Sequence, residues 1–168
     1  MGLSFDAWIL HPQIGELAAL ADSVPETQVI LDHAGRREEI FPAWAASIRE
    51  LAKRDNVVVK LGGMTMRVNG FGFEQRPAPP NSEEVAAAWR PYVETCIEAF
   101  GADRCMFESN FPVDKGSQGY VVMWNACKRP ARRRAERLGR RAGRRRLHLQ
   151  QRWLSVPDDR GLRLAYRR

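Results

Sequence analysis

Short apolar runs alternate with amphipathic stretches along the first three quarters of this 168-residue chain. Four runs are apolar enough for buried strands, and they occupy residues 3–10, 28–31, 56–61 and 104–108. Apolar residues at helical spacing lie between them, over residues 12–21, 40–54 and 82–99. The pattern predicts a strand followed by a helix, four times over, at intervals of roughly 32 residues, which is the length that each unit of a β/α barrel uses.

This repeat predicts a parallel α/β fold, in which either half of a (β/α)₈ barrel or a small open sheet would fit. Spacing alone does not choose between them. Polar side chains that can take part in catalysis or binding lie where the predicted strands end, and parallel folds form their active sites at this edge of the sheet. These strand-end side chains favour the barrel. The residues concerned are His11, Asp32, His33, Lys60 and residues 108–110.

Charge divides the chain into two parts. The whole chain has 27 Lys and Arg against 20 Asp and Glu, a net charge of +7. Residues 1–127 hold 11 basic and 17 acidic residues, whereas residues 128–168 hold 16 basic residues, 15 of them Arg, and 3 acidic ones. We therefore expect one folded unit over 1–127 and a separate, disordered Arg-rich tail over 128–168.

Two interpretations of the tail stay open. Its Arg clusters would bind nucleic acid or another anionic surface non-specifically, through phosphates. Alternatively the tail has no selected role, because Arg with Ala, Gly and Pro is the composition of GC-rich coding DNA that is read in a wrong frame.

Cysteine use and hydropathy point to a cytoplasmic protein that does not associate with membranes. The three cysteines form no CxxC pair and are odd in number, so we expect small buried side chains and neither a disulfide framework nor a thiolate zinc site. No apolar run approaches the roughly 18 residues of a membrane span, and the N-terminus has no signal-peptide pattern.

Several runs of residues resemble the C-terminal half of the amidohydrolase-related (amidohydrolase 2) family, and within it the sugar-lactonase-like branch of predicted metal-dependent TIM-barrel hydrolases. They are GLSFDAWILHPQ, VILDHAG, VVKLGGM, RPYVETCIEAFGADRCMFESNFPVDK and WNACKR, which together span about residues 1–129. The resemblance implies about four C-terminal βα units of a (β/α)₈ barrel. It also implies a small-molecule substrate, a lactone or similar cyclic ester, which is opened by water attack on a polarised carbonyl.

The resemblance also suggests site residues. His11 matches the family's fifth-strand histidine and His33 its sixth-strand histidine, and both would hold a divalent metal such as zinc or bind the carbonyl oxygen. Asn110 stands where most of the wider family has Asp, and because an amide is a poor metal ligand, metal-independent chemistry is the alternative. The candidates for substrate binding are Lys60, Arg67 and Asp32.

Each candidate also has a structural interpretation. Asn110 suits a turn before Phe111, Asp32 would brace a loop or His33, and Lys60 would be a solvated strand-end charge. Glu108 would be either a buried acid paired with Arg or an exposed one. Trp44 and Trp89 are expected in the core.

Whether the chain is an active enzyme stays open at the sequence level. The family's first-strand histidine pair is absent, so the chain looks like a fragment of its relatives. Four βα units leave two open sheet edges, which predicts a homodimer or aggregation. The alternative functions are nucleic-acid binding through the tail or a non-catalytic remnant.

Overall fold

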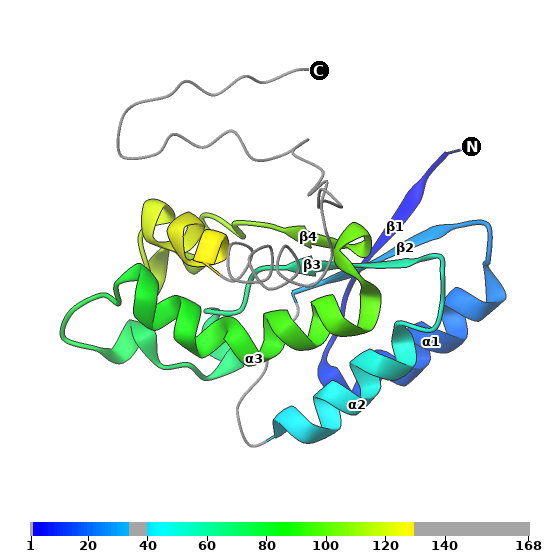
Figure 1. Cartoon of the computed structure of the whole chain (residues 1–168), viewed down its shortest axis with the longest axis horizontal. Helices are drawn as coiled ribbons and strands as arrows, with labels where there is room; N and C mark the ends of the chain where they lie inside the picture. The colour runs from blue at the N-terminus through cyan, green and yellow to red at the C-terminus, as the bar shows by residue number, and fades with distance from the viewer. Residues whose placement is uncertain (1, 34–39, 130–168) are drawn as a thin grey trace, which may run out of the picture.

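The computed structural model describes residues 2–33 and 40–129. Its centre is a parallel sheet of four strands, in which each strand pairs with the next one along the chain (Figure 1). The strands are β1 (Ser4–Trp8), β2 (Gln28–Asp32), β3 (Val57–Leu61) and β4 (Cys105–Phe107). All four predicted strands are therefore confirmed, with ends displaced by a few residues. Most of the Arg-rich tail lies outside the described residues.

The helices α1 (Ile14–Ser23), α2 (Phe41–Leu51) and α3 (Ser82–Phe100) all lie on one side of the sheet, below it in Figure 1. A further helical stretch covers residues 120–129. Pro12 lies within a short 3₁₀ turn, His11–Gln13, which leads into α1 because proline suits the first helical turn. Similar turns at Arg67–Asn69, Phe73–Gln75, Ala102–Arg104 and Val113–Gly116 complete the connections.

The core lies between the sheet and the helices. Val29, Val57 and Val59 point toward the helices and are fully buried, while their neighbours along each strand point to the opposite face and stay partly exposed. Trp44 and Trp89 are buried, as predicted. Cys96 and Cys127 are buried as well, whereas Cys105 is only partly buried.

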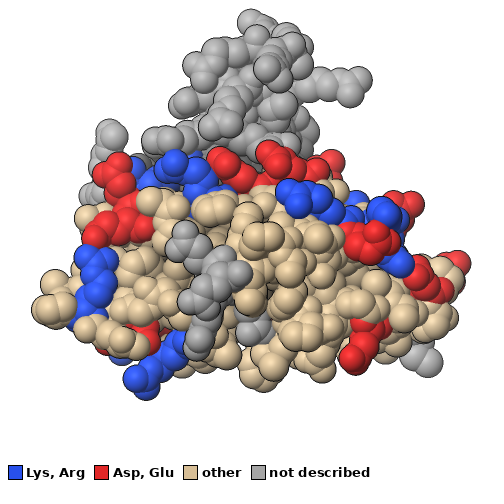
Figure 2. All heavy atoms as spheres, turned by 90° about the horizontal axis from the view of Figure 1, so that it is seen from below, with Lys and Arg blue, Asp and Glu red and all other residues tan. Residues whose placement is uncertain are grey.

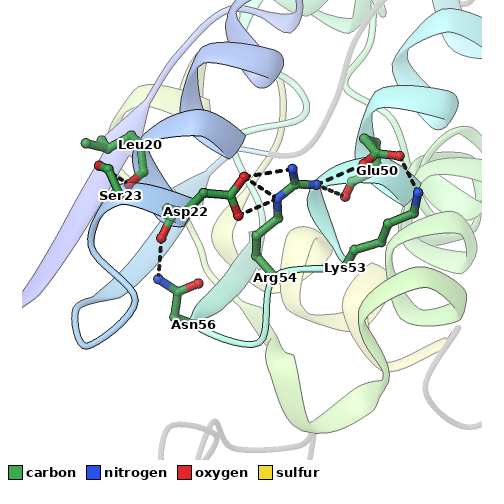
Figure 3. Close-up of polar contacts among 8 residues, drawn as sticks. Leu20, Asp22, Ser23, Glu50, Lys53, Arg54 and Asn56 are labelled. Carbon is green, nitrogen blue, oxygen red and sulfur yellow. Dashed lines mark hydrogen bonds and ion pairs between the residues drawn. The ribbon is translucent and has the colours of Figure 1, made fainter.

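The amino ends of the strands are tied together by a polar network (Figure 3). The Arg54 guanidinium lies between Asp22, at 2.9 Å, and Glu50, at 3.0 Å. Asn56 Nδ2 donates to the carbonyl oxygens of residues 21, 24 and 27 at 3.0 to 3.1 Å. Since the amino ends of barrel strands contribute to stability rather than catalysis, we assign this network a structural role.

Charged side chains of both signs intermingle around the helix-covered face of the molecule. Figure 2 shows them mostly toward its margins, with uncharged residues across the middle. The described part of the chain therefore presents no single-sign surface on this face. Within that part, no helix combines the length and the apolar character that crossing a membrane requires.

Candidate functional site

The carboxyl ends of β2 and β4 bring a histidine and an acid together. His33 directly follows β2, and Glu108 directly follows β4. Nδ1 of His33 donates a hydrogen bond to Oε1 of Glu108 at 2.6 Å, although the two residues are 75 positions apart in the sequence. The pair is only partly exposed, with 17% and 22% of the two side chains accessible. This contact leaves Nε2 as the imidazole nitrogen that is available for chemistry.

Two glycines after β3 make this pairing possible. A Cβ at Gly62 would overlap the Glu108 side chain, and a Cβ at Gly63 would overlap the His33 ring. Gly63 also has a φ of 61°, a conformation that costs glycine little and other residues considerably more. The VVKLGGM run therefore positions the pair by leaving space between its two members.

The surroundings of His33 shift its acidity. Burial favours the neutral ring, but the hydrogen bond to Glu108 and the charges of Glu108, Asp32 and Asp114 outweigh this effect, so the pKa of His33 is raised. His33 also has a φ of 60°, which is uncommon outside glycine. Such a conformation is found more often at functional positions than elsewhere.

Asn110 and Asp114 form a second pair at the same edge. The Asn110 amide Nδ2 donates to Asp114 Oδ1 at 3.0 Å, and the Asp114 backbone N–H donates back to the Asn110 carbonyl at 3.2 Å. Asp114 is fully buried, and burial raises the pKa of its carboxyl although the hydrogen bond from Asn110 opposes the shift. Because the amide nitrogen faces Asp114, the Asn110 Oδ1 is left as an acceptor for another partner.

Lys60 bridges three strands on the sheet face that points away from the helices. Its Nζ lies 2.6 Å from Asp6 Oδ1 on β1 and 2.8 Å from Asp32 Oδ1 on β2. Burial disfavours the charged ammonium, but the contacts with Asp32 and Asp6 dominate and raise the pKa of Lys60. Lys60 is thus a paired charge rather than a solvated one.

The remaining candidates lie farther from these pairs. Arg67 lies in the turn Arg67–Asn69 with 83% of its side chain exposed, and it makes a long contact of 3.7 Å with Glu74. His11 is partly buried after β1, and its ring makes no hydrogen bond or ion pair within the described residues. Over residues 2–33 and 40–129, no group of three or more His, Cys, Asp or Glu is placed to hold a metal ion.

Sequence reasoning proposed His33 and Asn110 as candidates but missed the partner of each. Glu108 was expected to pair with Arg or to be exposed, and instead it contacts His33. Asp114 was not considered, although its spacing of four from Asn110 fits a helix-like turn in which the two side chains meet.

Comparisons with known proteins agree with the resemblance noted in the sequence. A family model described as "Amidohydrolase" matches residues 1–144. An uncharacterized protein, y4mH, of Sinorhizobium fredii is 38% identical over 131 residues, which cover 76% of this chain and 40% of that protein. L-fucono-1,5-lactonase of Burkholderia ambifaria is 29% identical over 73% of this chain and 41% of the lactonase.

Solved structures support the fold. An amidohydrolase from Burkholderia multivorans with bound zinc superposes with a TM-score of 0.66 at 24% identity, over 80% of this chain and 48% of that one. The chain spans about 40% of the length of the curated relatives that it matches. Its four strands and their helices therefore correspond to part of a (β/α)₈ barrel, as predicted.

Proposed function

The chain belongs to the amidohydrolase family, and from that premise we propose that it contributes to a hydrolase that opens a lactone or a similar cyclic ester. The observation that carries this proposal is the His33–Glu108 pair at the carboxyl edge of the sheet. The pair holds an imidazole with one nitrogen fixed and the other available, which is the arrangement that proton transfer needs. The name of the Burkholderia ambifaria relative, an L-fucono-1,5-lactonase, supports the substrate class.

In the proposed reaction, Nε2 of neutral His33 accepts a proton from water as the water oxygen attacks the lactone carbonyl carbon. Glu108 holds the ring through Nδ1 and stabilises the imidazolium that forms. The bond from the carbonyl carbon to the ring oxygen then breaks, and His33 returns the proton to the leaving alkoxide. The product is a hydroxy acid, and His33 ends the cycle neutral.

The other site residues bind the substrate in this proposal. His11, at the end of β1, would donate to the carbonyl oxygen, and Asn110 would accept a hydrogen bond from a sugar hydroxyl through Oδ1. Asp32, Lys60 and Arg67 would contact further hydroxyl groups. Lys60 already pairs with the carboxylates of Asp6 and Asp32. We therefore expect Lys60 to orient these two carboxylates toward hydroxyl groups of the substrate, and not to bind a substrate carboxylate itself.

The described residues do not fit a zinc site on their own. Nδ1 of His33 is occupied by Glu108, so this residue would offer only Nε2, and a zinc site needs at least three protein ligands. A divalent metal would require donors beyond these residues. The steps above therefore use only proton transfer by His33.

The test is hydrolysis of a lactone panel by the whole chain, with and without added zinc, measured as acid release above the spontaneous rate. The panel includes L-fucono-1,5-lactone and other sugar lactones. We expect the His33→Gln variant to lose roughly 100-fold or more in rate, which is the usual contribution of a general base. If no lactone is hydrolysed in either condition, the proposed activity of this chain is wrong, while its family membership stands.

A further inference from the structure

A tryptophan ends β1 on the sheet face that points away from the helices. Successive residues of a strand point to opposite faces, and Ala7 is buried against the helices, so its neighbours Asp6 and Trp8 point the other way. Trp44 and Trp89 belong to the core between the sheet and the helices, whereas Trp8 contributes nothing to that core within the described residues. Packing against the helices therefore does not explain an indole at this position.

Strand register places Trp8 in a row of side chains at the carboxyl end of the sheet. Trp8 on β1 is level with Asp32 on β2. The Lys60 ammonium on β3 lies 2.8 Å from Asp32 and 2.6 Å from Asp6, which joins β3 to the same group. Neighbouring strands are about 4.8 Å apart, so the Trp8 side chain leaves the sheet beside that of Asp32. An aromatic surface and two carboxylates thus share one small area of this face.

Each of the two carboxylates keeps one oxygen for a further partner. Asp6 and Asp32 contact Lys60 through Oδ1, and over residues 2–33 and 40–129 no hydrogen bond or ion pair engages Oδ2 of either. Because the shared ammonium holds both carboxylates in place, these two acceptors are positioned before any ligand binds. An ionised carboxylate accepts hydrogen bonds but donates none, so a ligand at this position has to offer donors, as hydroxyl groups do.

A sugar ring matches this combination of surfaces. One side of such a ring presents C–H groups that make dispersion contacts with the face of an aromatic side chain, while the hydroxyl groups at its rim donate hydrogen bonds. The indole face is free for this contact, because within the described part of the chain no Lys or Arg lies over the Trp8 ring. A wholly apolar ligand would bring no donors to the carboxylates, and the carboxylates would repel an anion.

We propose that Trp8 is the platform on which the ring of a sugar lactone stacks, while Asp6 and Asp32 accept hydrogen bonds from its hydroxyl groups. This inference rests on the proposed function, since it names the residues that select the ring that His33 opens. Asp32 directly precedes His33 in the chain, so the platform lies at the same strand ends as the proposed base. Trp8 thus determines specificity and takes no part in proton transfer.

The test is the binding of two lactams to the whole chain, measured by calorimetry and by tryptophan emission. L-Fuconolactam has the hydroxylated ring of a sugar lactone with an amide in place of the ester, and δ-valerolactam has an equivalent ring without hydroxyl groups. We expect L-fuconolactam to bind about 10-fold more tightly or better, because hydrogen bonds to charged acceptors are the stronger ones. Trp8→Ala should weaken this binding about 10-fold, a usual contribution of aromatic stacking, and leave the circular dichroism spectrum unchanged, because Trp8 lies outside the core.

A second variant separates stacking from a merely structural role of Trp8. Trp8→Phe keeps an aromatic face, so it should bind L-fuconolactam within about 3-fold of the wild type and yet lose the change in emission that binding causes. Val121→Ala is the control, since it removes an exposed apolar side chain from the helical stretch at 120–129 and should leave the affinity unchanged. Equal affinity for the two lactams, an unchanged affinity of Trp8→Ala, or no binding at all would overturn the proposal. Binding through Trp8 without hydrolysis of any lactone would instead contradict the proposed function alone.

Discussion

At the scale of single residues, Gly63 sets the position of His33 through the absence of a side chain. We predict that Gly63→Ala lowers the free energy of unfolding by about 1–3 kcal/mol, because a Cβ would overlap the imidazole and because φ is positive. Urea denaturation measures the change. Gly15→Ala is the control, since a Cβ in this part of α1 meets nothing within 4 Å and should stabilise by about 0.5–1 kcal/mol. Equal effects of the two changes would contradict this role of Gly63.

The His33–Glu108 pair predicts a dependence of stability on pH. The pKa of His33 is raised in the folded protein above the 6.5 that is usual for histidine, because the acids around the ring outweigh the effect of burial. The folded state therefore holds the proton more tightly, so the stabilisation is complete below pH 6.5 and is lost as the pH rises through the folded pKa.

Glu108→Gln should remove most of this dependence. We expect the variant to be less stable than the wild type by about 1.5–3 kcal/mol at pH 5.5, which is the usual contribution of a hydrogen bond to a charged group, and by less at pH 9. Urea denaturation at the two pH values gives the comparison. A difference between wild type and variant that stays constant with pH would show that Glu108 acts only through packing.

The sequence predicted which of these residues lie at strand ends, but not which ones pair. The runs VILDHAG and MFESN place His33, Glu108 and Asn110 correctly, since strand ends follow from local patterning. The contact between His33 and Glu108 depends on how β2, β3 and β4 are aligned and on the space left by Gly62. Register and packing of this kind involve residues far apart in the chain, so no local pattern contains them.

At the scale of secondary-structure elements, Asn56 ties the end of α1 and the start of β2 to the turn before β3. Its amide donates to three carbonyl groups, so we predict that Asn56→Ala costs about 1–3 kcal/mol. Thermal or urea unfolding measures this loss. The adjacent Asp55→Ala, at an exposed position, should stay within about 0.5 kcal/mol. If both substitutions had the same small effect, the network would not hold these elements together.

Element positions could be predicted well where periodicity was strong and poorly where it was absent. The spacing of Ile40, Trp44, Ile48 and Leu51 predicted α2, and all but Ile40 are buried on its inner side. The stretch between β3 and α3 was predicted only as a Gly- and Pro-rich loop. It contains two 3₁₀ turns and packs Phe71 against Tyr92 with ring centroids 5.6 Å apart. Those contacts are tertiary, so the residues of the loop alone do not specify them.

At the scale of the whole molecule, strand order settles what spacing left open. A repeat of strand and helix fits both an open sheet and a barrel. In an open doubly wound sheet, however, the order of the strands reverses at one point, and helices cover both faces. Here the order is β1-β2-β3-β4, and α1, α2 and α3 share one side (Figure 1). The polar triad of Asp6, Lys60 and Asp32 on the other face gives that face a chemistry that an apolar pattern could not reveal.

The charge of the 168-residue chain is divided unevenly along its length. Residues 1–127 have a net charge of −6 and residues 128–168 a net charge of +13. Because Arg binds phosphate without reading sequence, we predict that the whole chain binds single-stranded RNA and duplex DNA of unrelated sequence with similar affinity. That affinity should fall by about 100-fold or more between 50 and 200 mM salt.

Fluorescence anisotropy of labelled oligonucleotides across a salt series measures this binding. A chain that ends at residue 129 should lose this binding, because the described face carries charges of both signs (Figure 2). The circular dichroism spectrum of the shortened chain should show that its helices persist. Binding that resists salt or discriminates between sequences would instead require shaped contacts to bases. The tail would then have a recognition function of its own, and the interpretation as misread coding DNA would be wrong.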